Sequence, residues 1–273
     1  MDDHFFTQWK QEHGVSQRQI TIVSWNVNGI RAAAKKGFLP WLHNSGAHIV
    51  AVQETKAHPE QLPAELRHPP GYHVDWCAAE TKGYSGVATF SQSVPTAVTC
   101  GLGEPRFDLE GRVLVSTFPD LVLFNIYFPN GGRGPEWVAH KLAFYARFVD
   151  VVRAALDDGL RVVVVGDVNT AYSELDLARP RENRTTSGFL PEEREAMAAF
   201  FAAGLVDTFR LLHPDAAQYT WWAPWAGARA RNIGWRLDYI FVSPNLQAAV
   251  VAADIHPDVP GSDHCPISLT LAL

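Results

Sequence analysis

Short runs of β-branched and apolar residues recur along the whole chain, and polar residues follow many of them. Ile20–Trp25, Ala47–Val52 and Arg161–Val165 are typical of buried strands. Helical periodicity falls between some of these runs but not between others, so the chain lacks the strict strand–helix–strand alternation of a single doubly wound sheet. The pattern therefore predicts two β-sheets with helices outside them.

The predicted elements continue to the end of the chain. Further strands are expected at Val87–Phe90, Val113–Phe118, Leu121–Tyr127, Leu237–Val242 and Ile267–Leu273. Helices are expected at Phe38–Ser45, Glu136–Leu156 and Pro191–Phe201, the last with a proline near its start and acids in its first turn. No linker-like stretch interrupts residues 20–273, so we expect one domain, preceded by an N-terminal extension of residues 1–19.

Composition excludes several classes of protein. The chain is 47% hydrophobic and 19% charged, as globular domains are. No apolar run approaches the ~20 residues of a membrane span, and no secretory signal pattern opens the sequence. The three cysteines, Cys77, Cys100 and Cys265, are widely spaced and form no CxxC motif. We therefore expect neither a disulfide framework nor a zinc knuckle, and a reducing compartment fits.

The formal net charge of −6 is unusual for a nucleic-acid-binding protein, which is commonly basic. The charge is uneven, however, because Arg179–Arg184 and Gly227–Arg236 each contain three arginines. The ordinary alternative is that these runs are solvated faces. A carboxylate metal site would also contribute negative charge, so the net charge does not exclude a nucleic-acid substrate.

Polar side chains gather at the predicted strand ends, where active sites are usually built. They are Asn26 and Asn28, Glu54, Asp167 and Asn169, Asp238, and Asp263 with His264. Each has an ordinary explanation by itself, since Asp and Asn are common turn residues. Their joint occurrence predicts a single site. Ile22–Asn28 also resembles Val164–Asn169, and two similar halves facing each other would bring both strand ends to one edge.

The residue types at these strand ends suit phosphodiester hydrolysis, which needs charge neutralisation, an in-line nucleophile and help for the departing oxygen. Glu54 and Asp263 offer the hard oxygen ligands that Mg²⁺ prefers, and Mn²⁺ is a second candidate. Asp167 is either the base that activates water or the acid for the leaving group.

A histidine and two amides complete the predicted chemistry. His264 either binds phosphate as an imidazolium or serves as the base, with Asp238 orienting its ring. Asn26 and Asn169 would hold the carboxylates and the phosphate through neutral hydrogen bonds.

Six sequence blocks occur in order along the chain. They are Ser24–Arg31, Gln53–Lys56, Tyr127–Asn130, Gly166–Asn169, Trp235–Tyr239 and Gly261–Pro266. Together they resemble the full motif set of the exonuclease III / AP endonuclease family, part of the endonuclease/exonuclease/phosphatase superfamily, from about Ile20 onward. The resemblance implies a four-layer α/β sandwich, in which two mixed β-sheets pack face to face with helices outside.

The resemblance also implies an activity. We expect a Mg²⁺-dependent DNA repair phosphodiesterase that cuts the backbone 5′ to abasic sites and removes 3′-blocking groups, with possible 3′→5′ exonuclease activity. Its partner would be double-stranded DNA with abasic sites or damaged 3′ ends, bent so that the abasic sugar turns out into a pocket. We expect a monomer in a bacterial-type cytoplasm, associated with the nucleoid and not with a membrane.

Matching positions give the expected roles. The resemblance implies metal ligands Glu54 and Asp263 with Asn28 beside them, and the catalytic residues Asp167, Asn169, His264, Asp238, Tyr127 and Asn26. It implies substrate contacts from Asn130, Arg133, Asn183, Trp221, Trp225, Trp235 and Leu237. Trp221, Trp235 and Leu237 would line the sugar pocket, with core packing as the alternative for Trp221. Arg133 and Trp225 would insert into the duplex.

Two positions depart from some members of the family. Asn28 stands where vertebrate-type enzymes have an acid, which argues against a tight second metal. Thr186 replaces an Asn found in some members, and the small Ser187 beside it should leave the pocket open.

Two other functions remain open from the residues alone. The first is another metal-dependent phosphodiesterase of the same fold, such as an inositol-phosphate phosphatase, a sphingomyelinase or a general DNase. The second is a catalytically silent nucleic-acid-binding relative, although the metal and catalytic residues are all present.

Overall fold

The structure is a computed structural model that describes residues 18–273. Its strands are β1 (Gln19–Asn26), β2 (Ile49–Gln53), β3 (His73–Cys77), β4 (Val87–Ser91), β5 (Ala97–Cys100), β6 (Val113–Thr117), β7 (Val122–Tyr127), β8 (Val162–Asp167), β9 (Val206–Asp207), β10 (Trp221–Trp222), β11 (Gly234–Trp235), β12 (Asp238–Val242), β13 (Val250–Ile255) and β14 (Ile267–Ala272). Its helices are α2 (Ile30–Lys35), α3 (Phe38–Asn44), α4 (Ala64–Arg67), α5 (Pro105–Asp108), α6 (Pro135–Asp157), α7 (Pro191–Ala202) and α8 (Thr208–Leu212). Short 3₁₀ turns are η1 (Pro59–Gln61), η2 (Glu174–Asp176) and η3 (Pro244–Ala249).

Within residues 18–273 the strands form two six-stranded sheets and one small two-stranded ribbon. The first sheet has the order β13-β14-β1-β2-β4-β3, and the second has the order β5-β6-β7-β8-β12-β9. The ribbon pairs β10 with β11. Both large sheets mix parallel and antiparallel neighbours, as predicted.

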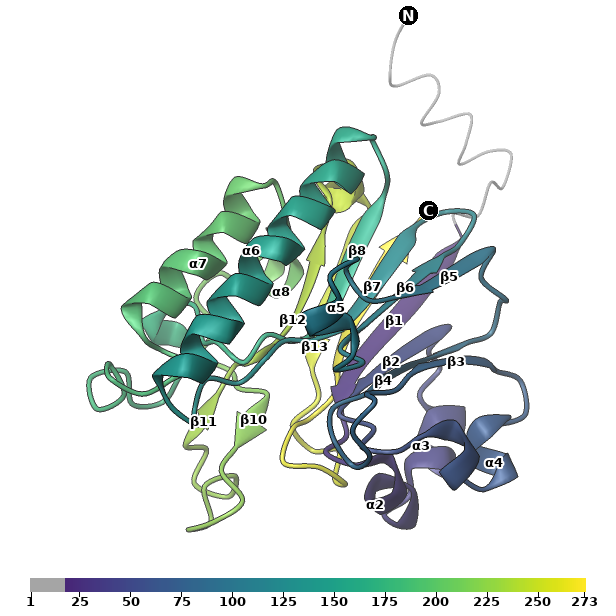
Figure 1. The fold of residues 1–273 in the computed structure, drawn as a ribbon, viewed down its shortest axis with the longest axis horizontal. Coiled ribbons are helices and arrows are strands. Elements are labelled where there is room, and N and C mark those ends of the chain that lie inside the picture. Colours follow the sequence, from purple (N-terminus) through teal and green to yellow (C-terminus); the bar gives the residue numbers. More distant parts are fainter. Residues whose placement is uncertain (1–17) are drawn as a thin grey trace, which may run out of the picture.

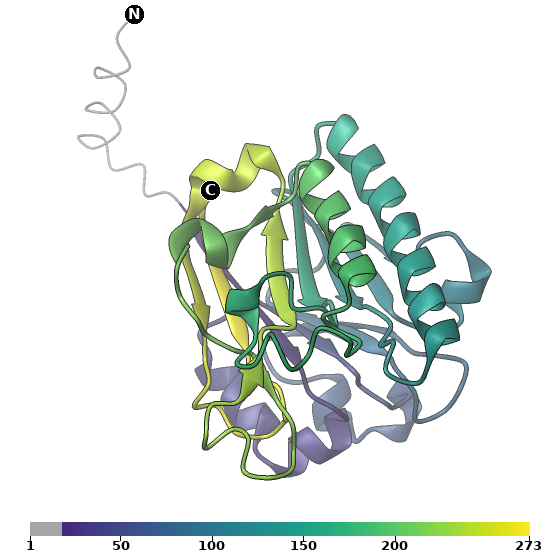
Figure 2. The same ribbon diagram turned by 90° about the vertical axis from the view of Figure 1, so that its left-hand side faces the viewer.

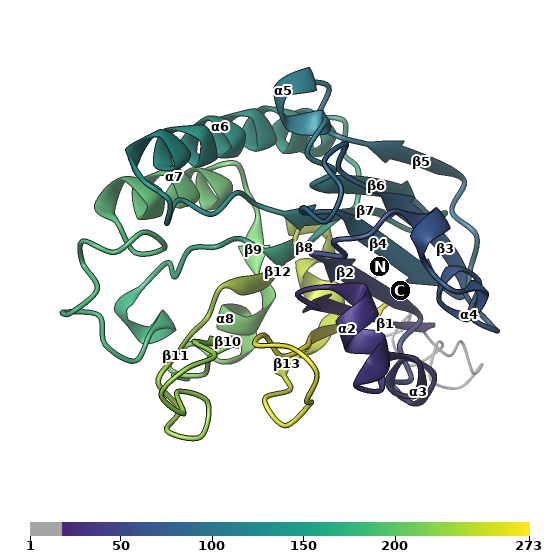
Figure 3. The ribbon, with the colours of Figure 1, turned by 60° about the horizontal axis from the view of Figure 1, so that its bottom comes forward.

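The sheets lie face to face between two layers of helices (Figures 1 and 3). Helices α6 and α7 run side by side over the outer face of the second sheet, as the turned view also shows (Figure 2). Helices α2 and α3 pack on the first sheet, where Phe38 and Leu42 are buried among its residues. The predicted four-layer α/β sandwich is thus confirmed.

The two sheets repeat one arrangement around their central strands, β1 and β8. Each central strand has a parallel neighbour, β2 or β7, and an antiparallel neighbour, β14 or β12. The turns that follow them are also alike, because the main-chain N–H of Asn28 donates to Asn26 at 3.0 Å and that of Asn169 donates to Asp167 at 2.8 Å. Asn28 and Asn169 both adopt positive φ, at 45° and 57°, which Asn tolerates better than most residues. The sequence similarity therefore marks equivalent positions in the two sheets.

Apolar side chains from both sheets fill the space between them. Ile22 and Leu269 of the first sheet and Val163 and Val165 of the second belong to one buried cluster. Near the ends of β2 and β7 the layer between the sheets contains polar side chains. There the Gln53 amide donates to Asn125 Oδ1 at 2.8 Å across the interface. A buried amide pair of this kind fixes how the two sheets align, since a slip would leave both groups unpaired.

The sequence explains where helix α6 begins and which of its faces is buried. Gly134 precedes it, Pro135 occupies its first turn, and buried side chains recur at helical spacing. They include Phe144, Tyr145, Phe148 and Val152, which pack on the second sheet.

The sequence-predicted strands and helices are all present, with ends shifted by one or two residues. The predicted extension lies outside the described residues except for its last two, and of these Gln19 begins β1. Outer strands were missed, because β5 is exposed along its length and offers no alternation of apolar and polar residues. Among residues 18–273, no helix is long and apolar enough to cross a membrane.

Candidate active site

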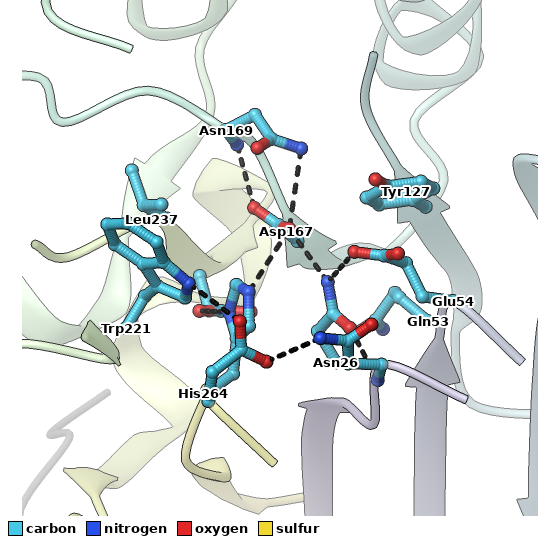
Figure 4. A network of polar contacts seen from close by, with 12 residues as sticks. Asn26, Gln53, Glu54, Tyr127, Asp167, Asn169, Trp221, Leu237 and His264 are labelled. Carbon is cyan, nitrogen blue, oxygen red and sulfur yellow. Dashed lines mark hydrogen bonds and ion pairs between the residues drawn. The ribbon is translucent and has the colours of Figure 1, made fainter. Parts of the chain in front are cut away.

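Asn26 joins the ends of the two sheets. Its buried side-chain amide donates to Glu54 Oε1 and to Asp167 Oδ2, each at 2.9 Å (Figure 4). Asn26 ends β1 and Asp167 ends β8, while Glu54 follows β2. One amide therefore holds two carboxylates that come from opposite sheets.

His264 is held on the other side of Asp167. Its Nδ1 lies 2.8 Å from Asp238 Oδ2, which also accepts a hydrogen bond from the Thr220 hydroxyl at 2.6 Å. The second ring nitrogen, Nε2, faces the site and lies 3.8 Å from Asp167 Oδ2. Because Asp238 binds Nδ1–H, the ring is oriented with Nε2 toward the cleft.

The two central groups have shifted pKa values. Burial raises the pKa of Asp167 to about 7, although the positive charge of His264 opposes the shift. Burial alone would lower the pKa of His264, but the Asp238 and Asp167 carboxylates outweigh it and raise that pKa to about 10. The neighbouring carboxylates therefore favour the imidazolium form of His264, and burial favours the protonated form of Asp167.

Asn169 supports Asp167 from the second sheet. Its side-chain amide donates to Asp167 Oδ2 at 3.3 Å and to the main-chain oxygen of Phe128 at 2.9 Å. Its own side-chain oxygen accepts a hydrogen bond from Asn130 at 2.9 Å. The Tyr127–Asn130 segment and the Asp167 turn are thereby fixed together.

Tyr127 stands at the end of β7, opposite Glu54 (Figure 4). Burial raises the pKa of its phenol well above the usual value, and the Glu54 carboxylate adds to the shift. The buried Arg112 guanidinium lies 4.8 Å from the centre of its ring and donates to its main-chain oxygen at 3.2 Å. The phenol therefore keeps its proton and is available as a hydrogen-bond donor at the edge of the cleft.

Three side chains in this site bring ligand-type atoms together at metal-binding spacing, and the two carboxylates among them keep lone pairs for an ion while His264 is an imidazolium. One atom each from Glu54, Asp167 and His264 lies within 4.8 Å of the others. Burial favours the protonated form of Glu54, yet the Lys56 ammonium at 2.7 Å outweighs it and lowers the pKa of that carboxyl. The Glu54 carboxylate is therefore charged, and it already attracts a cation. Oxygen ligands of this type suit a hard divalent ion.

Asp263 and Asn28, expected beside the metal, form a second contact chain that reaches Glu54. The Asn28 amide donates to Asp263 Oδ1 at 2.9 Å, and Trp221 Nε1 donates to Asp263 Oδ2 at 3.0 Å. Lys56 Nζ donates to Asn28 Oδ1 at 2.5 Å and so bridges Asn28 and Glu54. Lys56 was given no role from the sequence, although it closes the Gln53–Lys56 motif.

A cleft of about 310 Å³ opens over these groups. Its polar side carries Glu54, Asp167, Asn169, Asp263 and His264, among others. Its other wall is made by Trp221, Trp235, Leu237 and the Thr186–Gly188 segment. The structure therefore places the three predicted pocket residues together, beside a small-residue loop. The neighbouring Trp222 is buried in the core instead.

Three predicted substrate-binding residues do not line this cleft. Arg133 stacks its guanidinium 4.3 Å from the centre of the Trp137 ring. Trp225 lies in the loop between β10 and β11 and is 68% exposed. The Asn183 amide donates to the main-chain oxygen of Arg179 at 2.8 Å. Any substrate contact of these side chains would fall outside the central pocket.

The loop that forms the cleft wall rests on a buried ion pair that the sequence did not reveal. Lys141 Nζ lies 2.9 Å from Glu193 Oε1 and donates to the main-chain oxygen of Asn169 at 2.7 Å. Glu193 in turn accepts hydrogen bonds from the Ser187 hydroxyl at 2.7 Å and the Gly188 N–H at 2.5 Å. Both charged side chains are fully buried. Because lysine and glutamate are usually exposed, only their helical register could have signalled this pair.

Part of the predicted basic surface is structural. Arg236 is buried, where it bonds Asp176 at 2.7 Å and Asp207 at 2.8 Å. Arg229 donates to main-chain oxygens of the 257–262 loop, including that of Ser262 at 2.9 Å. The reading of Gly227–Arg236 as a run of surface charge was therefore wrong for Arg236, whose charge two carboxylates neutralise.

Two facing mixed sheets, with carboxylates, amides and a charged histidine converging at one end, define a hydrolase of phosphate esters. Residues 23–264 match the Endonuclease/Exonuclease/phosphatase family. Similar proteins include an exodeoxyribonuclease from Bacillus subtilis, 42% identical over 92% of this chain and 98% of its own length. The DNA repair nuclease APEX1 from Danio rerio is also 42% identical, over 92% of this chain and 82% of its own length.

Solved structures agree with these relatives. An AP endonuclease from Archaeoglobus fulgidus superposes with a TM-score of 0.86 at 28% identity, covering 93% of this chain and all of its own. The 3′ phosphatase NExo from Neisseria, bound to a product DNA hairpin, gives a TM-score of 0.87 at 27% identity, with the same coverage. The chain belongs to the Endonuclease/Exonuclease/phosphatase family, and within it to the exonuclease III / AP endonuclease group that its six motifs indicate.

Proposed function

We propose that this protein is a Mg²⁺-dependent DNA repair nuclease that hydrolyses the backbone 5′ to abasic sites and removes blocking groups from 3′ ends. The observation that carries the proposal is the Asn26 amide, which joins Glu54 and Asp167 beside an orientated His264. Relatives named as an exodeoxyribonuclease, a DNA repair nuclease and an AP endonuclease support the same substrate class.

The shape of the cleft supports an abasic sugar as the bound group. Trp221, Trp235 and Leu237 give an apolar wall, and Ser187 with Gly188 leaves room at its side. An extruded sugar without a base would fill this space, and extrusion costs least where no base is stacked.

The residues divide the catalytic work by charge. His264, positively charged and aimed by Asp238, would bind the scissile phosphate together with the Asn26 amide and the Tyr127 hydroxyl. Asp167, with a pKa of about 7, would take the proton from the attacking water. The protonated state of His264 favours this division over a histidine base.

The acidic side of the cleft would hold the metal ion. Glu54 is the central ligand in this proposal, with Asp263 and Asn28 beside it, and Mn²⁺ would fit the same oxygen donors. The ion would supply positive charge to the phosphate. We further propose that the protein acts as a monomer on double-stranded DNA, in the cytoplasm at the nucleoid.

A labelled duplex with one abasic analogue tests this function. We expect incision 5′ to the lesion in Mg²⁺, none in EDTA, and loss of incision in Asp167→Asn. The matched control is Asp150→Asn, which alters an exposed residue of α6 outside the cleft. A wild-type protein that binds the duplex but cuts neither it nor a blocked 3′ end would contradict the proposal. Faster hydrolysis of inositol phosphate or phospholipid would favour the other phosphodiesterases.

A further inference from the structure

Two of the three cysteines meet where the edges of the two sheets come together. Cys77 ends β3, the edge strand of the first sheet, and Cys100 ends β5, the edge strand of the second. The Cys100 thiol lies 3.9 Å from the main-chain oxygen of Trp76, the residue before Cys77. That contact and the shared packing around Leu114 bring the two cysteines together at the end of β3. The ends of two edge strands from different sheets are thus neighbours in space.

Both cysteines contact the same residue from opposite sheets. Leu114 is the ladder partner of Cys100 and packs in one buried cluster with Cys77. Cys77 is buried, whereas Cys100 is exposed to solvent. One thiol is therefore accessible to a soluble oxidant while its neighbour is protected from it. Tyr127, which lines the candidate active-site cleft, belongs to the same cluster as Cys77.

We propose that Cys77 and Cys100 form a site of reversible thiol oxidation, in which a disulfide joins β3 to β5 and so links the two sheets. The site is separate from the catalytic chemistry and does not depend on the proposed nuclease activity. Because the cross-link would close a loop between strands of different sheets, it would restrict the unfolded chain.

A peroxide is the oxidant class that completes the reaction. The Cys100 thiolate attacks one peroxide oxygen, the O–O bond breaks, and a sulfenic acid forms on Cys100 as the other oxygen leaves with a proton as water. The Cys77 sulfur then attacks the Cys100 sulfur. The S–S bond forms, the S–O bond breaks, and the hydroxyl leaves as a second water with the Cys77 proton. Overall, two thiols lose two electrons and two protons to hydrogen peroxide.

The electrostatics agree with this order of attack. The neighbouring Cys77 lowers the pKa of the Cys100 thiol, whereas the neighbouring Cys100 and burial raise the pKa of Cys77. A lower pKa at the exposed thiol favours the thiolate there, which is the reactive form.

The test is oxidation of the full-length protein with hydrogen peroxide, followed by denaturing alkylation and intact mass measurement. We expect wild type to lose two of its three alkylatable thiols, and proteolysis to yield one peptide pair joined through Cys77 and Cys100. Dithiothreitol should restore all three. The oxidised protein should unfold at a higher temperature than the reduced protein.

Two variants make the test specific. Cys100→Ser should form no intramolecular disulfide, whereas Cys265→Ala should still lose both remaining thiols, because Cys265 is buried and its thiol contacts the main-chain oxygen of Tyr219. Retention of three alkylatable thiols in oxidised wild type would overturn the proposal. So would a cross-link between two molecules, or an over-oxidised Cys100 beside an intact Cys77 thiol.

Discussion

The Asn26 amide lies 2.9 Å from Asp167 Oδ2, although these residues end the central strands of two different sheets. Each residue occupies the same place in its own sheet, and each accepts a hydrogen bond from the N–H two residues later. The candidate active site thus lies at the meeting point of two similar halves. One half presents a neutral amide where the other presents a carboxylate, so the pair attracts where two carboxylates would repel.

Asn26→Asp should therefore abolish catalysis, although the side chain keeps nearly the same size and shape. It replaces the donor to Glu54 and Asp167 with a third carboxylate. Loss of one preorganised donor commonly costs about 10²–10³ in rate, and we expect at least this loss in single-turnover incision. Asn44→Asp, at the exposed end of α3, is the control. Incision by Asn26→Asp at the wild-type rate would contradict the assigned role.

The incision rate should follow a bell-shaped pH profile. Its acid limb rises through about pH 7 as Asp167 loses its proton, and its alkaline limb falls through about pH 10 as His264 loses its own. Asp238→Asn should move the alkaline limb to lower pH, because Asp238 contributes most to raising the pKa of His264. An NMR titration of the His264 ring checks this independently. An unshifted ring pKa in the variant would refute the pairing.

Lys141→Met should destabilise the protein strongly. It leaves the fully buried Glu193 carboxylate without its partner, a change that typically costs about 3–5 kcal/mol. The measurement is the free energy of unfolding from urea titration. The matched control is Arg179→Met, which breaks the exposed pair with Glu182 and should cost less than about 1 kcal/mol. Equal losses in the two variants would argue against a structural role for the buried pair.

Acid should weaken the fold partly through Asp176. Burial alone would raise the pKa of this carboxyl, but Arg236 and Arg210 hold it below the usual 3.8. The folded state then binds fewer protons than the unfolded chain, so this stabilisation is present above pH 3.8 and is lost as the pH falls through the folded value. Asp176→Asn should flatten the pH dependence of unfolding below about pH 5, and Asp215→Asn, at an exposed position, should not. An unchanged slope in Asp176→Asn would disprove the coupling.

Trp225→Ala should weaken binding to an abasic duplex. The ring is 68% exposed on the β10–β11 loop, where an apolar wedge could stack against a distorted base step. Stacking on an aromatic side chain is worth about 1–3 kcal/mol, so affinity should fall roughly 5- to 150-fold. Val94→Ala, at another exposed apolar residue, controls for surface change. Equal affinities of wild type and Trp225→Ala would exclude the wedge.

The sequence predicts those features that depend on local order. Ile22–Asn28 and Val164–Asn169 reveal buried strands with polar ends, and the structure places Asn26 beside Asp167. It does not predict features that need a distant partner. Lys141 looks like a surface residue of an amphipathic helix until Glu193 is brought beside it from α7.

The environment of a charged side chain is equally hard to predict from the sequence. Arg236 counts as surface charge in the sequence, yet Asp176 and Asp207 enclose it. The sequence does not predict the contact between Lys56 and Glu54. Both residues adopt positive φ in this turn, and that conformation depends on the surrounding strands. Spacing along the chain gives the identity of the site, but the sign and magnitude of its electrostatics come from tertiary packing.

The order of strands in the first sheet has a consequence for synthesis. Strand β1 is made long before its antiparallel neighbour β14, and Asp263 and His264 lie shortly before β14 in the sequence. A nascent chain that lacks residues 263–272 can therefore complete neither the first sheet nor the cleft. Domains form as units once their sequence has emerged. A ribosome-bound precursor that ends before these residues would carry the Asn26 and Glu54 motifs without any power to cut nucleic acid, so translation itself delays the appearance of the nuclease until residues 263–272 have emerged.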